Sequence, residues 1–153
     1  MKRLIALTFA VVCVLSLAGC QEQVSNYSFR GEHEYFAISN VSINLDDKKE
    51  VFDGGKIEIT QSGFFEEVAS YSTTFYVLIN GEQNIILSNS VIDQTGDAVS
   101  IDSDLGSISG EGVVIGNGVE NIDELSENLW FELKTTDLNG EEKLYQIQLT
   151  ITE

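Results

Sequence analysis

The chain has 153 residues, of which 25 are acidic and 8 are basic, giving a formal net charge of −17 at pH 7. A surface this acidic repels phosphate groups, which argues against nucleic-acid binding and against attachment to anionic lipid headgroups through charge. The chain is long enough for one domain with an ordinary hydrophobic core and too short for two domains of typical size. Three roles remain compatible with the acidity: solubility, attraction of divalent cations and steering toward a basic partner.

The first twenty residues have the features of an export signal. Lys2 and Arg3 precede an uncharged, apolar stretch at 4–15. As a helix this stretch would span only about 18 Å, well short of the roughly 30 Å hydrocarbon core of a membrane. We therefore expect a cleaved signal rather than a membrane-spanning helix.

The signal ends in Leu17-Ala18-Gly19-Cys20. This sequence resembles the lipobox of bacterial lipoproteins. The resemblance implies that Cys20 takes a diacylglyceryl group, that a signal peptidase cuts before it, and that lipid holds the chain on the extracytoplasmic face of the cell membrane. We expect a signal peptide at 1–19, the lipidated Cys20 and a short tether at 20–26, and a single domain at 27–153. Because Cys13 lies in the signal, the domain would contain no disulfide.

Period-2 alternation of apolar and polar residues dominates the domain. In the first part of the chain it predicts a strand at 27–30, a break at Gly31-Glu32 and a second strand at 35–45. Asp53-Gly54-Gly55 is expected to turn the chain again, into a strand at 56–60.

The clearest hairpin signal lies in the middle of the chain. Alternating segments at 72–79 and 83–87 flank Asn80-Gly81. An Asn-Gly pair accepts positive φ at both central positions of a tight turn, so these segments are expected to pair as antiparallel strands.

A second hairpin is expected near the C-terminus. Alternating strands at 129–134 and 145–151 flank a turn at 137–140. The glycine-rich segment 106–118 predicts bulges or an irregular connection, and 121–128 is compatible with one helical turn. Short strands with turn signals and no long helical period predict an all-β fold, an antiparallel β-sandwich or a partly open barrel with at most one short helical turn.

Both ends of the domain carry a second resemblance. Tyr27-Ser28-Phe29-Arg30-Gly31-Glu32, followed by Tyr35-Phe36, resembles the start of small uncharacterised lipoproteins of Gram-positive, Bacillus-like bacteria. The end of the chain has the same order of features as theirs: a glycine-rich stretch at 110–118, a Trp-containing strand at 129–133, the Asn139-Gly140 turn and a last strand at 144–149. The middle is not covered, and Tyr35-Phe36 stands where Trp is commoner. The resemblance implies an envelope location and a β fold, and it brings no known activity.

His33 is the only histidine and lies in an expected turn between Glu32 and Glu34. A neighbouring carboxylate can orient an imidazole as a general base. However, nothing marks one of the serines as its nucleophile, and no Gly-x-Ser-x-Gly elbow is present. We interpret His33 as an exposed turn residue and expect no catalytic residues and no zinc site.

Acidic side chains are the other candidates for chemistry. Asp102-x-Asp104 with Gly106 partly matches a calcium loop but fails the EF-hand pattern. A looser site would add Asp93 or Asp97 from the preceding turn, whereas a solvated acidic loop is the commoner reading of such a stretch.

A pair of carboxylates, Glu66-Glu67, follows Phe64-Phe65. Apolar neighbours raise a carboxyl pKa, as an acid–base pair would need. On a strand, adjacent side chains point to opposite faces, which argues against the two carboxylates acting together as an acid–base pair.

Trp130 and Tyr76 are expected on outward faces of strands, where they form a contact surface or pack in a second layer. The sequence as a whole favours a lipid-anchored, non-catalytic binding or accessory module of the cell envelope. Its acidic face would steer toward a basic envelope protein, and Trp130 would supply contact energy. The alternative is a calcium-binding lipoprotein with Asp93, Asp97, Asp102 and Asp104 as ligands, and a hydrolase using carboxylates is a third class. No cofactor other than that calcium is expected.

Overall fold

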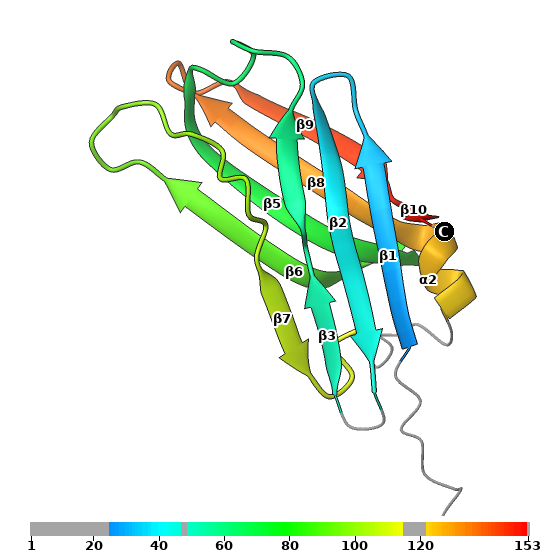
Figure 1. The fold of residues 1–153 in the computed structure, drawn as a ribbon. Coiled ribbons are helices and arrows are strands. Elements are labelled where there is room, and N and C mark those ends of the chain that lie inside the picture. Colours follow the sequence, from blue (N-terminus) through cyan, green and yellow to red (C-terminus); the bar gives the residue numbers. More distant parts are fainter. Residues whose placement is uncertain (1–24, 47–48, 115–121, 153) are drawn as a thin grey trace, which may run out of the picture.

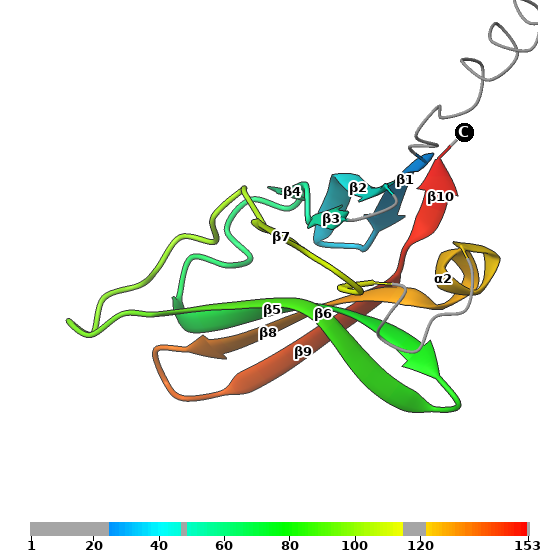
Figure 2. The same ribbon diagram turned by 90° about the horizontal axis from the view of Figure 1, so that it is seen from below.

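Two antiparallel sheets pack face to face in the computed structural model, which describes residues 25–46, 49–114 and 122–152 (Figures 1 and 2). The expectation of an all-β sandwich is confirmed. The first sheet has the order β10-β1-β2-β3-β7, with β4 also on β2, and the second has the order β6-β5-β8-β9. The first sheet comprises β1 (Ser25–Glu32), β2 (Phe36–Leu45), β3 (Glu50–Asp53), β4 (Lys56–Ile59), β7 (Ser107–Gly110) and β10 (Thr150–Thr152). The second comprises β5 (Val68–Ile79), β6 (Glu82–Ile92), β8 (Leu129–Asp137) and β9 (Glu142–Gln148).

One short helix, α2 (Ile122–Asn128), lies at the side of the sandwich and leads directly into β8 (Figure 2). Its Leu125 is fully buried in the core and anchors the helix there. In the described part of the chain, no helix is long and apolar enough to cross a membrane.

The core lies between the sheets and follows the alternation of the sequence. Val41 and Ile43 of β2 and Phe131 and Leu133 of β8 all belong to this core, and all four are 0% exposed. Aromatic rings join the layers: Phe75 lies edge-on to Phe52 with ring centroids 5.1 Å apart. Such edge contacts between rings add to the stabilisation from burial.

The expected break at Gly31-Glu32 is wrong. β1 begins at Ser25, two residues earlier than the expected strand, and continues through Gly31 with a register shift just before it. A Cβ at Gly31 would lie 2.7 Å from both Ile147 Cδ1 and Leu149 Cδ2. The glycine is therefore required by close packing of the two layers, not by a turn.

The expected turn at Asp53-Gly54-Gly55 is also wrong. Both β3 and β4 pair antiparallel with β2, with Ser42 opposite Asp53 and Ser39 opposite Lys56. The chain keeps its direction through the glycines and only bends. The segment that leads into β7 lies beside this bend. There the Gly54 N–H donates to the carbonyl of Gly106 at 2.8 Å.

The hairpin at Asn80-Gly81 is confirmed, with φ of 54° and 82° at the two residues. The C-terminal strand expected at 145–151 instead divides into β9 and β10, which lie in different sheets. Leu149 is the crossing point; it is fully buried and its N–H donates to the carbonyl of Leu129 at 2.8 Å. Beyond it, Ile151 pairs with β1 and is 47% exposed.

Candidate binding site at the end of the sandwich

Aromatic side chains gather near the end of β1. This end of the sandwich is remote from the start of β1 at Ser25 (Figure 1). Tyr35 comes from the β1–β2 turn, Phe64 and Phe65 from the β4–β5 connection, and Tyr145 from β9. Tyr35 stacks on Phe64 with centroids 3.7 Å apart and planes 11° apart. Tyr145 meets Phe65 edge-on at 5.7 Å. Rings from three distant parts of the chain thus form one cluster.

His33 belongs to this aromatic cluster, so its interpretation as exposed is wrong, although it does lie in the turn between β1 and β2. Its ring is half-buried, stacks on Phe36 at 4.9 Å and lies edge-on to Tyr145 at 5.6 Å. The Tyr35 N–H points to its Nδ1 at 3.4 Å. The histidine orders the turn that carries Tyr35.

A cavity of about 200 Å³ lies between the β4–β5 connection and the β8–β9 hairpin. The rings of Phe64, Phe65 and Tyr145 and the buried Val68 form its apolar lining, next to the buried hydroxyl residue Thr135. Phe64 and Phe65 come from the β4–β5 connection, and Tyr145 and Thr135 come from strands of the second sheet, so this aromatic floor exists only in the folded chain.

Carboxylates surround this aromatic floor. Glu66 and Glu67 line the cavity from one side, and Asp137 and Glu141 line it from the hairpin. Glu66 and Glu67 do not lie on a strand with side chains on opposite faces, as expected, because residues 62–67 form turns. The Leu138 N–H donates to the Glu67 carbonyl at 2.9 Å and ties the two sides together.

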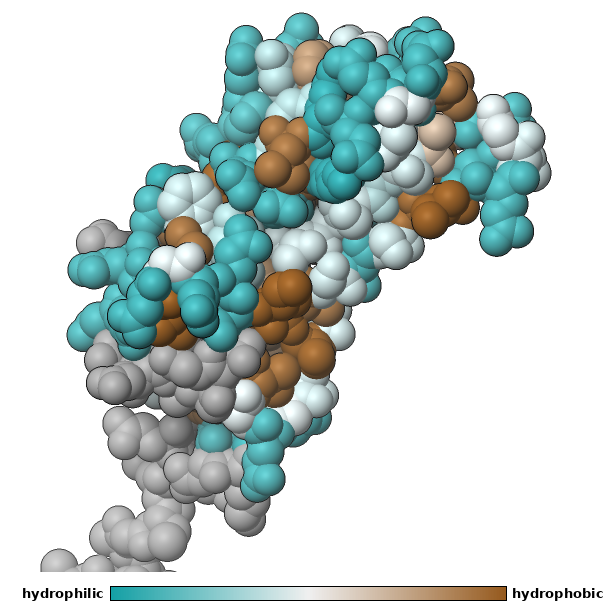
Figure 3. Space-filling view, turned by 180° about the vertical axis from the view of Figure 1, so that it is seen from behind, coloured by the Kyte–Doolittle hydropathy of each residue, from teal (hydrophilic) through white to brown (hydrophobic). Residues whose placement is uncertain are grey.

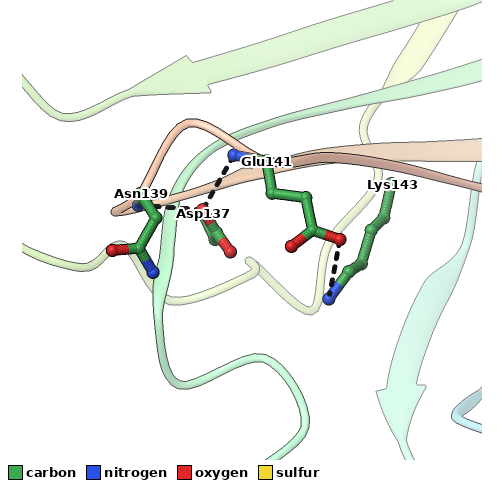
Figure 4. Close-up of polar contacts among 4 residues, drawn as sticks. All are labelled: Asp137, Asn139, Glu141 and Lys143. Carbon is green, nitrogen blue, oxygen red and sulfur yellow. Dashed lines mark hydrogen bonds and ion pairs between the residues drawn. The ribbon is translucent and has the colours of Figure 1, made fainter.

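The hairpin side of the cavity is ordered by Asp137 (Figure 4). One oxygen, Oδ1, accepts the N–H groups of Asn139 at 2.8 Å and of Glu141 at 2.9 Å. Next along the strand, Lys143 Nζ lies 3.9 Å from Glu141 Oε1. Of the described residues that line the cavity, Lys143 alone is basic, so the lining carries an excess of negative charge.

The phenols of the cluster stay protonated at neutral pH. Burial is the largest cause that raises the pKa of Tyr145, and the nearby Tyr35 and Glu141 raise it further, against a hydrogen bond with Thr135 that lowers it. The charge of Glu34 is the main cause that raises the pKa of Tyr35. Both hydroxyls are therefore neutral groups beside the carboxylates.

The four candidate calcium ligands fall into two separate turns. In the first, Asp93 Oδ2 accepts the N–H groups of Thr95 at 2.9 Å and of Asp97 at 2.7 Å. The Thr95 hydroxyl contacts Asp93 at 2.8 Å and Asp97 Oδ2 at 3.0 Å. The Thr95 side chain is the largest cause that lowers the pKa of Asp93.

In the second turn, Asp102 Oδ1 accepts the Asp104 N–H at 3.1 Å, and Asp104 Oδ1 accepts the Gly106 N–H at 2.8 Å. Among the described residues, no group of three or more His, Cys, Asp or Glu side chains is placed to hold a metal ion. Each of these turns is ordered by backbone N–H groups that donate to its carboxylates.

Trp130 lies half-buried on the outer face of the second sheet, opposite Tyr76 and Gln148. Tyr76 is 2% exposed and its hydroxyl contacts Gln146 Nε2 at 3.3 Å, so it packs rather than offering contact surface. Seen from this side, hydrophobic residues form separate patches between hydrophilic ones (Figure 3). The structure does not bring Trp130 to the cavity. Cys20 lies outside the described residues.

No protein-family model matches the chain, and no significant match was found among curated proteins or among solved structures. The cavity itself was missed by sequence reasoning. Its only local signal is Phe64-Phe65-Glu66-Glu67, in which aromatic and acidic residues adjoin; the hairpin residues that complete it lie about seventy positions further along the chain.

Proposed function

We propose that the chain is a lipid-anchored, non-catalytic binding module of the cell envelope that recognises a basic partner through the cavity at the end of the sandwich. The observation that carries the proposal is the composition of that cavity. Flat aromatic surface from Phe65 and Tyr145 adjoins carboxylates from Glu66, Glu67 and Glu141. Aromatic rings supply contact area, and a cation is attracted both by their faces and by the carboxylates.

The place of the cavity relative to the tether supports the same role. With Cys20 lipidated, only residues 21–24 separate the anchor from Ser25, the first residue of β1. β1 has 8 residues and so extends about 26 Å at about 3.3 Å per residue before the chain turns at the aromatic cluster. The cavity would therefore lie at the end of the sandwich remote from the anchor, within reach of partners in the envelope.

Binding is favoured over catalysis by the role of the imidazole. A histidine is the side chain best suited to proton transfer near neutral pH. His33 stacks on Phe36 and accepts a backbone N–H, and it does not line the cavity. The calcium alternative is not adopted, because oxygens of Asp93, Asp102 and Asp104 already accept hydrogen bonds within their own turns.

The test is capture of a partner from an envelope extract, with the full-length chain in neutral detergent as bait at low salt. We expect a stoichiometric basic protein that is released as salt rises, because screening weakens attraction between charges. The double variant Glu66→Gln/Glu67→Gln should lose it. The control Glu82→Gln/Glu127→Gln removes the same charge from exposed residues that do not line the cavity, and it should retain the partner. Equal retention by both variants would contradict the proposal.

A further inference from the structure

Lys143 is an exception in an otherwise acidic cavity. Its side chain is 49% exposed, and its ammonium lies 3.9 Å from Glu141 Oε1, at the outer limit of an ion pair (Figure 4). Lys134, on the neighbouring strand, makes a shorter pair, with Nζ 2.9 Å from Glu142 Oε2. Lys143 is opposite the buried Thr135, whereas Lys134 is opposite the exposed Leu144, so the two lysines lie on opposite faces of one hairpin.

We infer that Lys143 occupies the position that a ligand cation takes in the cavity, and that this cation is a lysine side chain of the partner. This inference rests on the proposed function. A primary ammonium on a methylene stem matches the cavity in two respects. The carboxylates of Glu66, Glu67 and Glu141 receive the charge, and the rings of Phe65 and Tyr145 receive the stem.

The long distance between Lys143 and Glu141 means that little free energy is needed to displace Lys143 from this ion pair. A half-exposed ion pair at this distance is screened by water and contributes little to stability. Lys143 has a flexible stem and can rotate into solvent while Glu141 passes to the incoming ammonium. Until Lys143 rotates away, its positive charge repels the incoming ammonium. Lys143 therefore lowers the affinity of the cavity for the ligand.

The probe is a hexapeptide of alternating glycine and lysine, titrated at low salt into the full-length chain in neutral detergent. Lys143→Gln should tighten peptide binding about threefold or more relative to Lys134→Gln, the size of effect that a single partly screened charge produces. Lys134→Gln is the matched control because it removes the same charge from the same hairpin, on the other face. The ε-methylene protons of the peptide lysine should shift upfield in NMR spectra, since they lie over aromatic rings. Thermal melts establish that both variants are folded.

Equal affinities of the two variants, or weaker binding by Lys143→Gln, would overturn the inference. So would binding of an alternating glycine–glutamate hexapeptide with the same affinity. If the lysine peptide does not bind at all, the lysine ligand is wrong. The capture experiment then decides the proposed function separately: a partner lost from the Glu66→Gln/Glu67→Gln variant leaves the function standing with another ligand, and a partner retained by it removes both.

Discussion

Asn40 of β2 and Gly55 of the β3–β4 connection lie against one another, where the chain bends. Both have left-handed backbone, with φ of 59° and 65°. A Cβ added at Gly55 would lie 2.2 Å from the Ser39 carbonyl oxygen. Because backbone atoms cannot move aside as a flexible side chain can, this position admits only glycine.

The first prediction follows from that contact. Gly55→Ala should lower the free energy of unfolding by about 3 kcal/mol or more, as expected of a severe backbone clash. Gly81→Ala is the control, since its φ of 82° is equally unfavourable for alanine but nothing lies within 4 Å of the added Cβ. It should cost only about 1 kcal/mol. Urea unfolding of the two variants measures the difference, and equal losses would show that the bend has no role of its own.

The second prediction concerns the hairpin beside the cavity. Asp137→Ala leaves the N–H groups of Asn139 and Glu141 without their shared acceptor. We expect a loss of about 1–2 kcal/mol in unfolding free energy, typical of a carboxylate that accepts backbone N–H groups at a turn. Asn139→Ala removes an exposed side chain from the same turn and should change stability little. A smaller loss for Asp137→Ala than for Asn139→Ala would contradict this assignment.

The third prediction concerns acid. The pKa of Asp93 is lowered chiefly by the Thr95 side chain, so the folded state releases the proton more readily than the unfolded state. The resulting stability is present above the unfolded pKa of about 3.9 and is lost as pH falls through the folded pKa. An NMR titration of the Asp93 carboxyl carbon should give a midpoint below about 3.9, and Thr95→Val should raise that midpoint. No change in Thr95→Val would show that the hydroxyl is not the cause.

The fourth prediction concerns alkali. Burial raises the pKa of Tyr145 in the folded state, so the unfolded state loses its phenol proton first. This contribution to stability is complete below the unfolded pKa of about 10 and declines as pH rises from there through the folded pKa. Unfolding free energies measured across this range should fall with pH, and less steeply in Tyr145→Phe. An unchanged slope in that variant would be inconsistent with the buried phenol.

Local signals in the sequence were enough for some elements and misleading for others. Asn80-Gly81 predicted its hairpin because the turn depends on the backbone preferences of two adjacent residues. Asp53-Gly54-Gly55 contains residues that favour turns just as strongly. However, both flanking strands pair with β2, so the chain bends at the glycines without reversing direction. Alternation continued through Leu149, although the chain changes sheets there. Tertiary pairing overrode the local pattern in both cases.

The candidate site was beyond sequence reasoning for a related reason. Aromatic and acidic residues at 64–67 signal a cavity wall only once Asp137, Glu141 and Tyr145 are known to lie opposite. The hydrogen bond from the Leu138 N–H to the Glu67 carbonyl joins these two sides of the cavity. No pattern in the sequence indicates it. The calcium ligand set Asp93, Asp97, Asp102 and Asp104 stays a prediction. What the sequence did not indicate is that these aspartates accept hydrogen bonds within two separate turns.

The most direct measurement of the central claim is the affinity of the glycine–lysine hexapeptide for the unaltered chain, for Glu66→Gln/Glu67→Gln and for Glu82→Gln/Glu127→Gln, at low and high salt. Recognition of a cation in the cavity predicts salt-sensitive binding that the first double variant weakens about tenfold and that the second leaves nearly unchanged, since two of the lining carboxylates are then lost. Equal weakening by the two variants would mean that the peptide responds only to the overall negative charge, and the account of the cavity would be wrong.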